Sequence, residues 1–138
     1  MLTTTYIEGR PSTADYLSLR HAAGWYAFDQ ERANASLNNS LYIIHVRCGN
    51  EVIGFGRVVG DGQAYFYIQD ILVAPEFRRR GIGTQIVKQL MSYLDSVAPE
   101  NSGAFIGLMI APGLLEFYTK FGFQQFTEQK PALKIWRK

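Results

Sequence analysis

The feature that most constrains the fold of this chain is a change of hydrophobic pattern between residues 64 and 94. The first part is a β-prone run that ends at Val73, two residues before Pro75, which cannot donate to a β-ladder. After Gly81 the apolar side chains recur at every fourth position, the spacing of one face of an α-helix. These positions are Ile82, Ile86, Leu90 and Leu94. A strand followed by a helix with one long apolar face indicates an α/β domain.

The rest of the chain is expected to add elements to the same sheet. Two tight-turn signals, at residues 48–51 and 60–62, separate three β-prone stretches and predict an antiparallel meander. No repeat or linker divides the sequence, so we expect one domain over residues 1–138. The expected fold is a mixed central sheet flanked by helices, in the order β-α-α-β-β-β-α-β-α-β-β. Its strands cover residues 3–8, 41–47, 52–59, 64–73, 104–110, 123–127 and 132–136, and its helices cover residues 11–24, 29–37, 81–94 and 113–118.

Composition limits the classes of protein to which this chain can belong. With 138 residues, 47% of them hydrophobic, it is long enough for one core and too apolar for disorder. One cysteine and two histidines disfavour a disulfide framework and a metal site, and a cytoplasmic location is the default expectation. No apolar run approaches the ~18 residues of a membrane span. We therefore expect no metal and no membrane partner.

The positive charge is concentrated in one place. The formal net charge is +2, and three of the fourteen Lys and Arg are consecutive, Arg78 to Arg80. The other eleven, against twelve Asp and Glu, leave −1 for the rest of the chain. Three arginines neutralise few phosphates of a polyanion, so we expect no nucleic-acid partner, with a weak and salt-sensitive binder as the rival interpretation.

The turn after the strand has the properties of an anion site. Gly81 and Gly83 lack Cβ atoms and lie where a helix begins, so an anion can approach backbone N–H groups that have no partner within the helix. Two common phosphate-binding motifs do not fit. A Walker loop needs Lys before the Ser or Thr, and no Lys precedes Thr84; a dinucleotide-binding fingerprint needs Gly at position 86, which is Ile here. A phosphate or pyrophosphate cradle is predicted, with a plain solvated basic turn as the alternative.

Two motifs resemble those of the GNAT superfamily of N-acetyltransferases. Arg78-x-x-Gly81-x-Gly83, between an apolar strand and a long helix, is similar to the family's acetyl-CoA loop, Gln/Arg-x-x-Gly-x-Gly/Ala. Downstream, Tyr118 with Gly122-Phe123 resembles the family's Tyr-x-x-x-Gly-Phe segment. The expected order of elements resembles the GNAT fold over essentially the whole chain, as in a small single-domain member.

The resemblance implies acetyl-CoA as the cosubstrate and direct transfer of the acetyl group to a primary amine, without an acyl-enzyme. The main chain of residues 71–73 would pair with the pantetheine arm, and an N–H near Leu72 would polarise the thioester carbonyl. The basic turn would hold the pyrophosphate. Cys48 is then expected to be a small buried side chain and not a nucleophile. The implied cosubstrate-binding residues are Ile71, Leu72, Val73, Arg78, Arg79, Arg80, Gly81, Ile82, Gly83 and Thr84.

The same resemblance assigns roles at the reaction centre. Tyr118 would be the general acid that protonates the leaving thiolate. A position that carries Glu in polyamine-acetylating relatives is Gln69 here, and Gln cannot accept a proton. Asp70 beside it is the candidate base, with an ordered water as one alternative and a structural role for Asp70 as another. An Asn that many relatives have seven residues before the tyrosine is Ala111 in this chain, so that cofactor contact is missing.

The acceptor is expected to be a small amine. Three aromatic residues follow the first helix and could line a pocket for it, with plain core packing as the alternative. The expected acceptor-binding residues are Trp25, Tyr26, Phe28, Tyr67 and Gln69. A protein N-terminus or lysine as acceptor, a non-catalytic module that binds acyl-CoA, and a homodimeric state are left open by the sequence.

Overall fold

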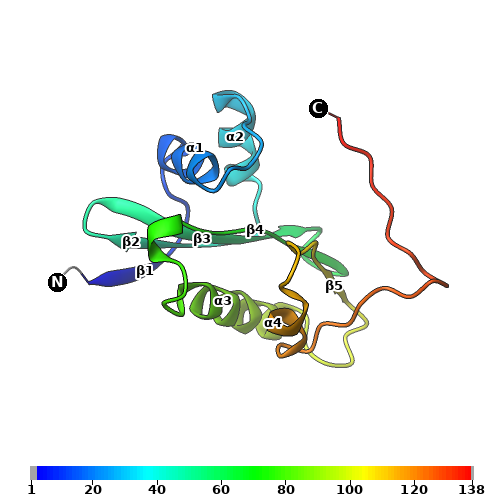
Figure 1. Ribbon diagram of the computed structural model, residues 1–138. Coiled ribbons are helices and arrows are strands. Elements are labelled where there is room, and N and C mark those ends of the chain that lie inside the picture. The colour runs from blue at the N-terminus through cyan, green and yellow to red at the C-terminus, as the bar shows by residue number, and fades with distance from the viewer. Residues whose placement is uncertain (1–2, 138) are drawn as a thin grey trace. The chain divides into compact units, whose positions relative to one another are not determined.

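The strand, turn and helix predicted between residues 64 and 94 are present. Strand β4 covers Tyr65–Val73, a single 3₁₀ turn, η1, covers Pro75–Phe77, and helix α3 covers Ile82–Val97. The apolar side chains at the predicted spacing of four, from Ile82 to Leu94, are all buried. They cover one face of the sheet, below the strands in Figure 1.

The structure, a computed structural model, describes residues 3–137, and contacts group the chain into two compact units, Met1–Leu108 and Met109–Lys138. The first unit contains one sheet in the order β1-β2-β3-β4-β5. Strands β2 to β4 pair antiparallel, as predicted; β1 also pairs antiparallel with β2, and β5 pairs parallel with β4. This confirms a mixed α/β sheet flanked by helices. The other strands are β1 at Thr4–Glu8, β2 at Tyr42–Cys48, β3 at Glu51–Gly60 and β5 at Phe105–Gly107.

Two helices lie on the opposite face of the sheet from α3 (Figure 1). Helix α1 covers Thr13–Ala22 and α2 covers Gln30–Asn38. Each begins after a capping side chain: Ser12 accepts from Asp15 N and Asp29 accepts from Arg32 N, which satisfies one free N–H per helix. Because helices cover both faces, every residue of β3 from 52 to 58 is buried.

The close approach of α3 to the sheet depends on Gly56 in β3. A Cβ atom at this position would lie 2.6 Å from Cγ2 of Ile86 and 3.2 Å from Cδ1 of Leu90. No real Cβ contact is that short, so a side chain here would force the helix away from the strand. The absence of a side chain at Gly56 therefore sets the spacing between α3 and β3.

The second unit differs from the sequence prediction. Its described residues, 109–137, contain helix α4 at Leu115–Thr119 and no strand, so the strands expected at 123–127 and 132–136 are wrong. The strand expected at 104–110 is reduced to β5. Alternating apolar residues form a strand only where a neighbouring strand supplies the hydrogen bonds and a face to pack on. Here Leu133, Ile135 and Trp136 are exposed. The single-domain organisation stays a prediction.

No helix within residues 3–137 is both long enough and apolar enough to cross a membrane. The same residues contain no group of three or more His, Cys, Asp or Glu side chains placed to hold a metal ion. Cys48 is a buried free thiol, as predicted.

Candidate functional site

Strand β4 is irregular at its centre. The pairing with β3 passes from Arg57↔Gln69 to Phe55↔Leu72, so Asp70 and Ile71 lie opposite the single residue Gly56. Asp70 has a φ of +58°, in the left-handed region that an L-residue rarely adopts. An extra residue in one strand is a β-bulge, and bulges change the direction in which the strand presents its main chain.

The outer edge of β4 is open beyond this bulge. Its parallel neighbour β5 pairs with residues Tyr65, Phe66 and Tyr67, and no other strand among residues 3–137 pairs with this edge. Residues 68–73 therefore present main-chain groups on one side without a strand partner. An extended ligand that carries amide groups can bind there as an added strand.

The turn after β4 leads directly to an uncapped helix start. Gly81 precedes α3 with a φ of +81°, no side chain among the described residues caps the helix, and its first turn contains no acidic residue. A Cβ atom at Gly81 would have no neighbour within 4 Å, and one at Gly83 would touch only Val73 Cγ2 at 4.0 Å. The free N–H groups at this positive helix end are accessible, which suits an anion.

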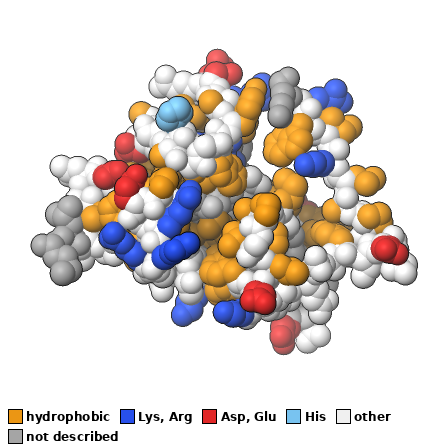
Figure 2. All heavy atoms as spheres, in the orientation of Figure 1, with side chains coloured by type: hydrophobic (Ala, Val, Ile, Leu, Met, Phe, Trp, Pro, Cys, Tyr) orange, Lys and Arg blue, Asp and Glu red, His pale blue; other side chains and the backbone are white. Residues whose placement is uncertain are grey.

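Basic side chains surround this helix start. All three arginines of the triplet are exposed. Arg78 Nε donates to the main-chain oxygen of Val73 at 3.1 Å, which ties the turn to the end of β4. The Arg80 guanidinium lies 5.2 Å from the centre of the Phe77 ring. Basic side chains gather in Figure 2 on the face where Figure 1 shows the segment between β4 and α3.

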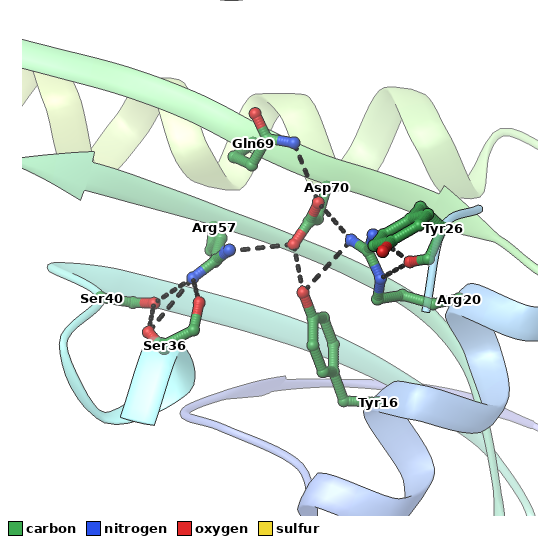
Figure 3. Close-up of polar contacts among 8 residues, drawn as sticks. All are labelled: Tyr16, Arg20, Tyr26, Ser36, Ser40, Arg57, Gln69 and Asp70. Carbon is green, nitrogen blue, oxygen red and sulfur yellow. Dashed lines mark hydrogen bonds and ion pairs between the residues drawn. The ribbon is translucent and has the colours of Figure 1, made fainter. Parts of the chain in front are cut away.

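A buried polar network surrounds the carboxylate of Asp70, at the bulge of β4 (Figure 3). Asp70 is 2% exposed, and each of its oxygens accepts two hydrogen bonds. Oδ1 accepts from Arg20 Nη1 and Gln69 Nε2, both at 3.0 Å. Oδ2 accepts from Arg57 Nε at 3.1 Å and from the hydroxyl of Tyr16. These four donors come from α1, β3 and β4.

The two arginines connect the network to further elements. Arg57 Nη1 donates to Ser36 Oγ at 2.6 Å and to Ser40 Oγ at 3.2 Å, at the end of α2. Arg20 donates from Nε and Nη2 to the main-chain oxygen of Tyr26, at 3.1 and 2.6 Å. Two guanidinium groups and one carboxylate give a buried cluster with an excess of one positive charge.

The structure brings some of the predicted site residues together. The guanidinium of Arg20 lies 4.4 Å from the Phe28 ring centre and 5.4 Å from that of Trp25, so the aromatic segment is anchored to the network. Tyr26 is exposed and packs edge-on against Phe28. Gln69 turns its amide to Asp70. Tyr67 is half-buried on β4.

The contacts of Asp70 favour a different role from the general base predicted. A carboxylate has about four acceptor sites, and all four are occupied by donors within the protein. A proton acceptor needs a free lone pair directed at the substrate. The sequence prediction missed Tyr16, Arg20 and Arg57; an arginine inside the apolar run 52–59 is the signal that could have found the last of these.

Tyr118 lies on α4 in the second unit. Its ring packs edge-on against Phe117, with the ring centres 4.9 Å apart, and against Phe123 at 6.1 Å. Burial raises the pKa of the Tyr118 phenol above its ordinary value. The phenol therefore keeps its proton at neutral pH, as a proton donor requires.

Comparison with known proteins gives one consistent result. A family model described as an acetyltransferase (GNAT) domain matches residues 38–125. An uncharacterised N-acetyltransferase, ycf52, of Pyropia yezoensis is 26% identical over 106 residues, which cover 74% of this chain and 59% of the relative. The chain thus spans less than two thirds of that curated relative.

Solved structures agree in fold. A probable acetyltransferase of unknown function from meticillin-resistant Staphylococcus aureus superposes with a TM-score of 0.85 at 30% identity, covering 98% of both chains. The aminoglycoside N-acetyltransferase AAC(6')-Iy in complex with CoA has a TM-score of 0.67 at 15% identity, covering 100% of this chain and 96% of its own. That second likeness shows the fold alone.

Proposed function

This chain belongs to the GNAT family of acetyltransferases, and on that premise we propose that it transfers the acetyl group of acetyl-CoA to a primary amine. The observation that carries the proposal is the continuity of two surfaces: the open edge of β4 at residues 68–73 leads directly into the uncapped, basic start of α3. A ligand with an extended amide-containing arm at one end and a pyrophosphate at the other matches that order.

The residues present fit this cosubstrate. Main-chain groups of Ile71, Leu72 and Val73 would bind the pantetheine arm, and the amides from Arg79 to Thr84 would hold the pyrophosphate. The open space in front of Gly81 and Gly83 leaves room for phosphate oxygens close to the backbone. Bound acetyl-CoA supplies a thioester, whose carbonyl carbon is open to attack by an amine.

The protein's own groups then have two tasks, and water has a third. A main-chain N–H near Leu72 donates to the thioester oxygen and stabilises the charge that develops there during attack. The phenol of Tyr118 gives its proton to the sulfur as the C–S bond breaks. Because the oxygens of Asp70 are occupied, the proton lost by the amine goes to water. No acyl-enzyme is needed, since the amine attacks the thioester directly.

We propose a small molecule as the acceptor. Trp25, Tyr26 and Phe28 support this choice, because they place aromatic surface next to the buried network through Arg20. Aromatic faces suit a flat or apolar amine or the ammonium form of an amine. A cytoplasmic location belongs to the same proposal.

The direct test measures release of free thiol from acetyl-CoA with two acceptor panels, one of small amines and one of peptides, alongside calorimetric titration with CoA. We expect CoA to bind and thiol to be released with at least one small amine. Release with peptides alone would assign a protein acetyltransferase. Binding without release on either panel would assign a non-catalytic acyl-CoA module, and no binding of CoA would reject the proposed cosubstrate.

A further inference from the structure

The left-handed backbone of Asp70 is unusual because it lies inside a strand. Two other described non-glycine residues with a positive φ, Arg79 and Asn101, lie in turns. A left-handed L-residue costs roughly 1–2 kcal/mol relative to ordinary backbone, so surrounding contacts must hold it there. Such strain persists only where the structure over-determines it, and it concentrates at functional sites.

The contacts that hold Asp70 come from helix α1, on the face of the sheet opposite α3, and from strands β3 and β4. Tyr16 and Arg20 are four residues apart on α1, so both side chains leave the same face of the helix. Arg57 reaches the carboxylate from β3, where it pairs with Gln69 in the ladder. Figure 3 shows these side chains converging on the carboxylate. The carboxylate is thereby fixed in position by three elements of the chain.

We propose that Asp70 is a positioning residue whose anchored carboxylate keeps β4 bulged and thereby sets the main chain of residues 71–73 for the pantetheine arm and the thioester oxygen. Tyr16, Arg20 and Arg57 are the residues through which it is held. The inference rests on the proposed function, because it assigns a role within the acetyl-CoA site.

The geometry gives this role a physical basis. The ladder with β3 is interrupted at Asp70 and Ile71 and resumes at Leu72, two residues after the anchored Asp70. If the carboxylate lost its partners, the strain at Asp70 would be released by a change of φ, and such a change would rotate the peptide groups that follow. The N–H directed at the thioester oxygen lies within this stretch, and a displacement of ~1 Å in such a group can reduce the rate by ~100-fold.

The test compares backbone amide signals by NMR during titration with CoA, in the wild-type chain and in Asp70→Asn. Asn keeps the size of the side chain but removes its charge and replaces one acceptor oxygen with a donor, so it cannot hold all four donors that contact Asp70. In the wild type we expect the amides of residues 71–73 and of 81–84 to shift. In Asp70→Asn we expect the response of 81–84 to remain and that of 71–73 to be lost, with kcat reduced by roughly 10- to 100-fold.

The pH dependence of the rate separates positioning from proton transfer. A positioning role predicts that Asp70→Asn lowers kcat at every pH without moving the midpoints of the profile. A general base predicts that the acidic limb disappears. A purely structural role predicts a lower melting temperature with wild-type kcat and wild-type shifts at 71–73 in the folded protein. Either of the last two results would overturn the proposal.

A milder variant keeps the proposal testable if Asp70→Asn does not fold. Tyr16→Phe removes one donor to Asp70 and keeps both ion pairs and the ring contact with Phe55. Its matched control is Tyr42→Phe. This variant removes a hydroxyl on β2 that donates to Glu8 Oε1 on β1 at 2.8 Å and has no contact with the Asp70 carboxylate. We expect a weaker CoA response at 71–73 in Tyr16→Phe and an unchanged one in Tyr42→Phe.

Equal responses in the two tyrosine variants would overturn the positioning role. Absence of any CoA response in the wild type would instead reject the proposed function, and the inference with it. The two failures are therefore distinguishable.

Discussion

Arg57 Nε on β3 lies 3.1 Å from Asp70 Oδ2 on β4, and both side chains are almost fully removed from solvent. Burying a charged pair is favourable only where further hydrogen bonds complete it, and here the two serines at the end of α2 accept from Arg57. The ion pair joins two strands at the centre of the sheet, and the hydrogen bonds from Arg57 to the serines connect it to the helical layer.

Arg57→Ala is expected to destabilise the fold strongly. Asp70 would keep Arg20 as a partner but lose one of its two ion pairs, and breaking a buried pair costs about 3 kcal/mol or more. Urea denaturation followed by circular dichroism measures the free energy of unfolding. The control is Arg47→Ala, which removes a hydrogen bond to the main chain of Asn50 in an exposed turn and should cost less than about 1 kcal/mol. Equal losses in the two variants would contradict this account of the network.

Gly56→Ala is expected to lower the free energy of unfolding by about 1–3 kcal/mol through overpacking against Ile86. Adding Ile86→Ala should make the double variant more stable than the sum of the two single losses predicts, because the new methyl group then has space. Gly83→Ala is the matched control. Its new Cβ touches only Val73 Cγ2 at 4.0 Å, and Ala favours a helix over Gly by about 0.8–1 kcal/mol. A neutral Gly56→Ala would show that α3 is not held against β3 as described.

Local features of the sequence were sufficient to predict the strand, turn and helix between residues 64 and 94. The spacing of Ile82, Ile86, Leu90 and Leu94 reports a helix face directly, and a glycine marks its start. Both are properties of neighbouring residues. The strands expected at 123–127 and 132–136 were wrong because a strand depends on its partner, and β-prone composition does not specify one.

The network around Asp70 could not be predicted for a related reason. Asp70 is 54 residues from Tyr16 and 50 from Arg20 along the chain, so no spacing rule connects them. The bulge could not be predicted either, because buried and less buried side chains alternate along β4 without interruption. Asp70 is buried like Ile68 before it and Leu72 after it. The sequence prediction placed Asp70 at the site but could not identify what its carboxylate contacts.

The stability of the fold is expected to fall at alkaline pH. Burial, followed by the charge of Asp70, raises the pKa of Tyr16 from 10.0 to about 12. The unfolded chain therefore releases this proton first, so the stabilisation is complete below pH 10.0 and is lost as the pH rises towards about 12. Urea midpoints measured between these values should decline less steeply in Tyr16→Phe. The pKa of Tyr42 is also raised to about 12, so we expect the urea midpoint to decline less steeply with pH in Tyr42→Phe as well. A wild-type slope in both variants would contradict the assignment.

Tyr118→Phe is expected to reduce kcat by about 100-fold, the lower range for loss of a general acid, with little effect on the Kd for CoA. The variant removes the phenolic proton and keeps the ring that packs against Phe117 and Phe123. Tyr93→Phe on α3, where the ring is stacked on Tyr42, is the control and should leave kcat unchanged. Stopped-flow thiol release and calorimetry give the two constants. An unchanged kcat in Tyr118→Phe would reject the general-acid role. A higher Kd for CoA with a normal kcat would assign Tyr118 to binding.

Gly83→Leu is expected to weaken CoA binding at least ~10-fold, or by about 1.4 kcal/mol, while the fold remains intact. The position is helical, and the space around it is open except for Val73 Cγ2 at 4.0 Å, so a larger side chain occupies the region where phosphate oxygens must approach the free N–H groups. Lys88→Leu places the same side chain on an exposed position of the same helix and should leave the affinity unchanged. Calorimetric titration with CoA separates the two. Equal affinity in both variants would mean that the start of α3 does not hold the pyrophosphate.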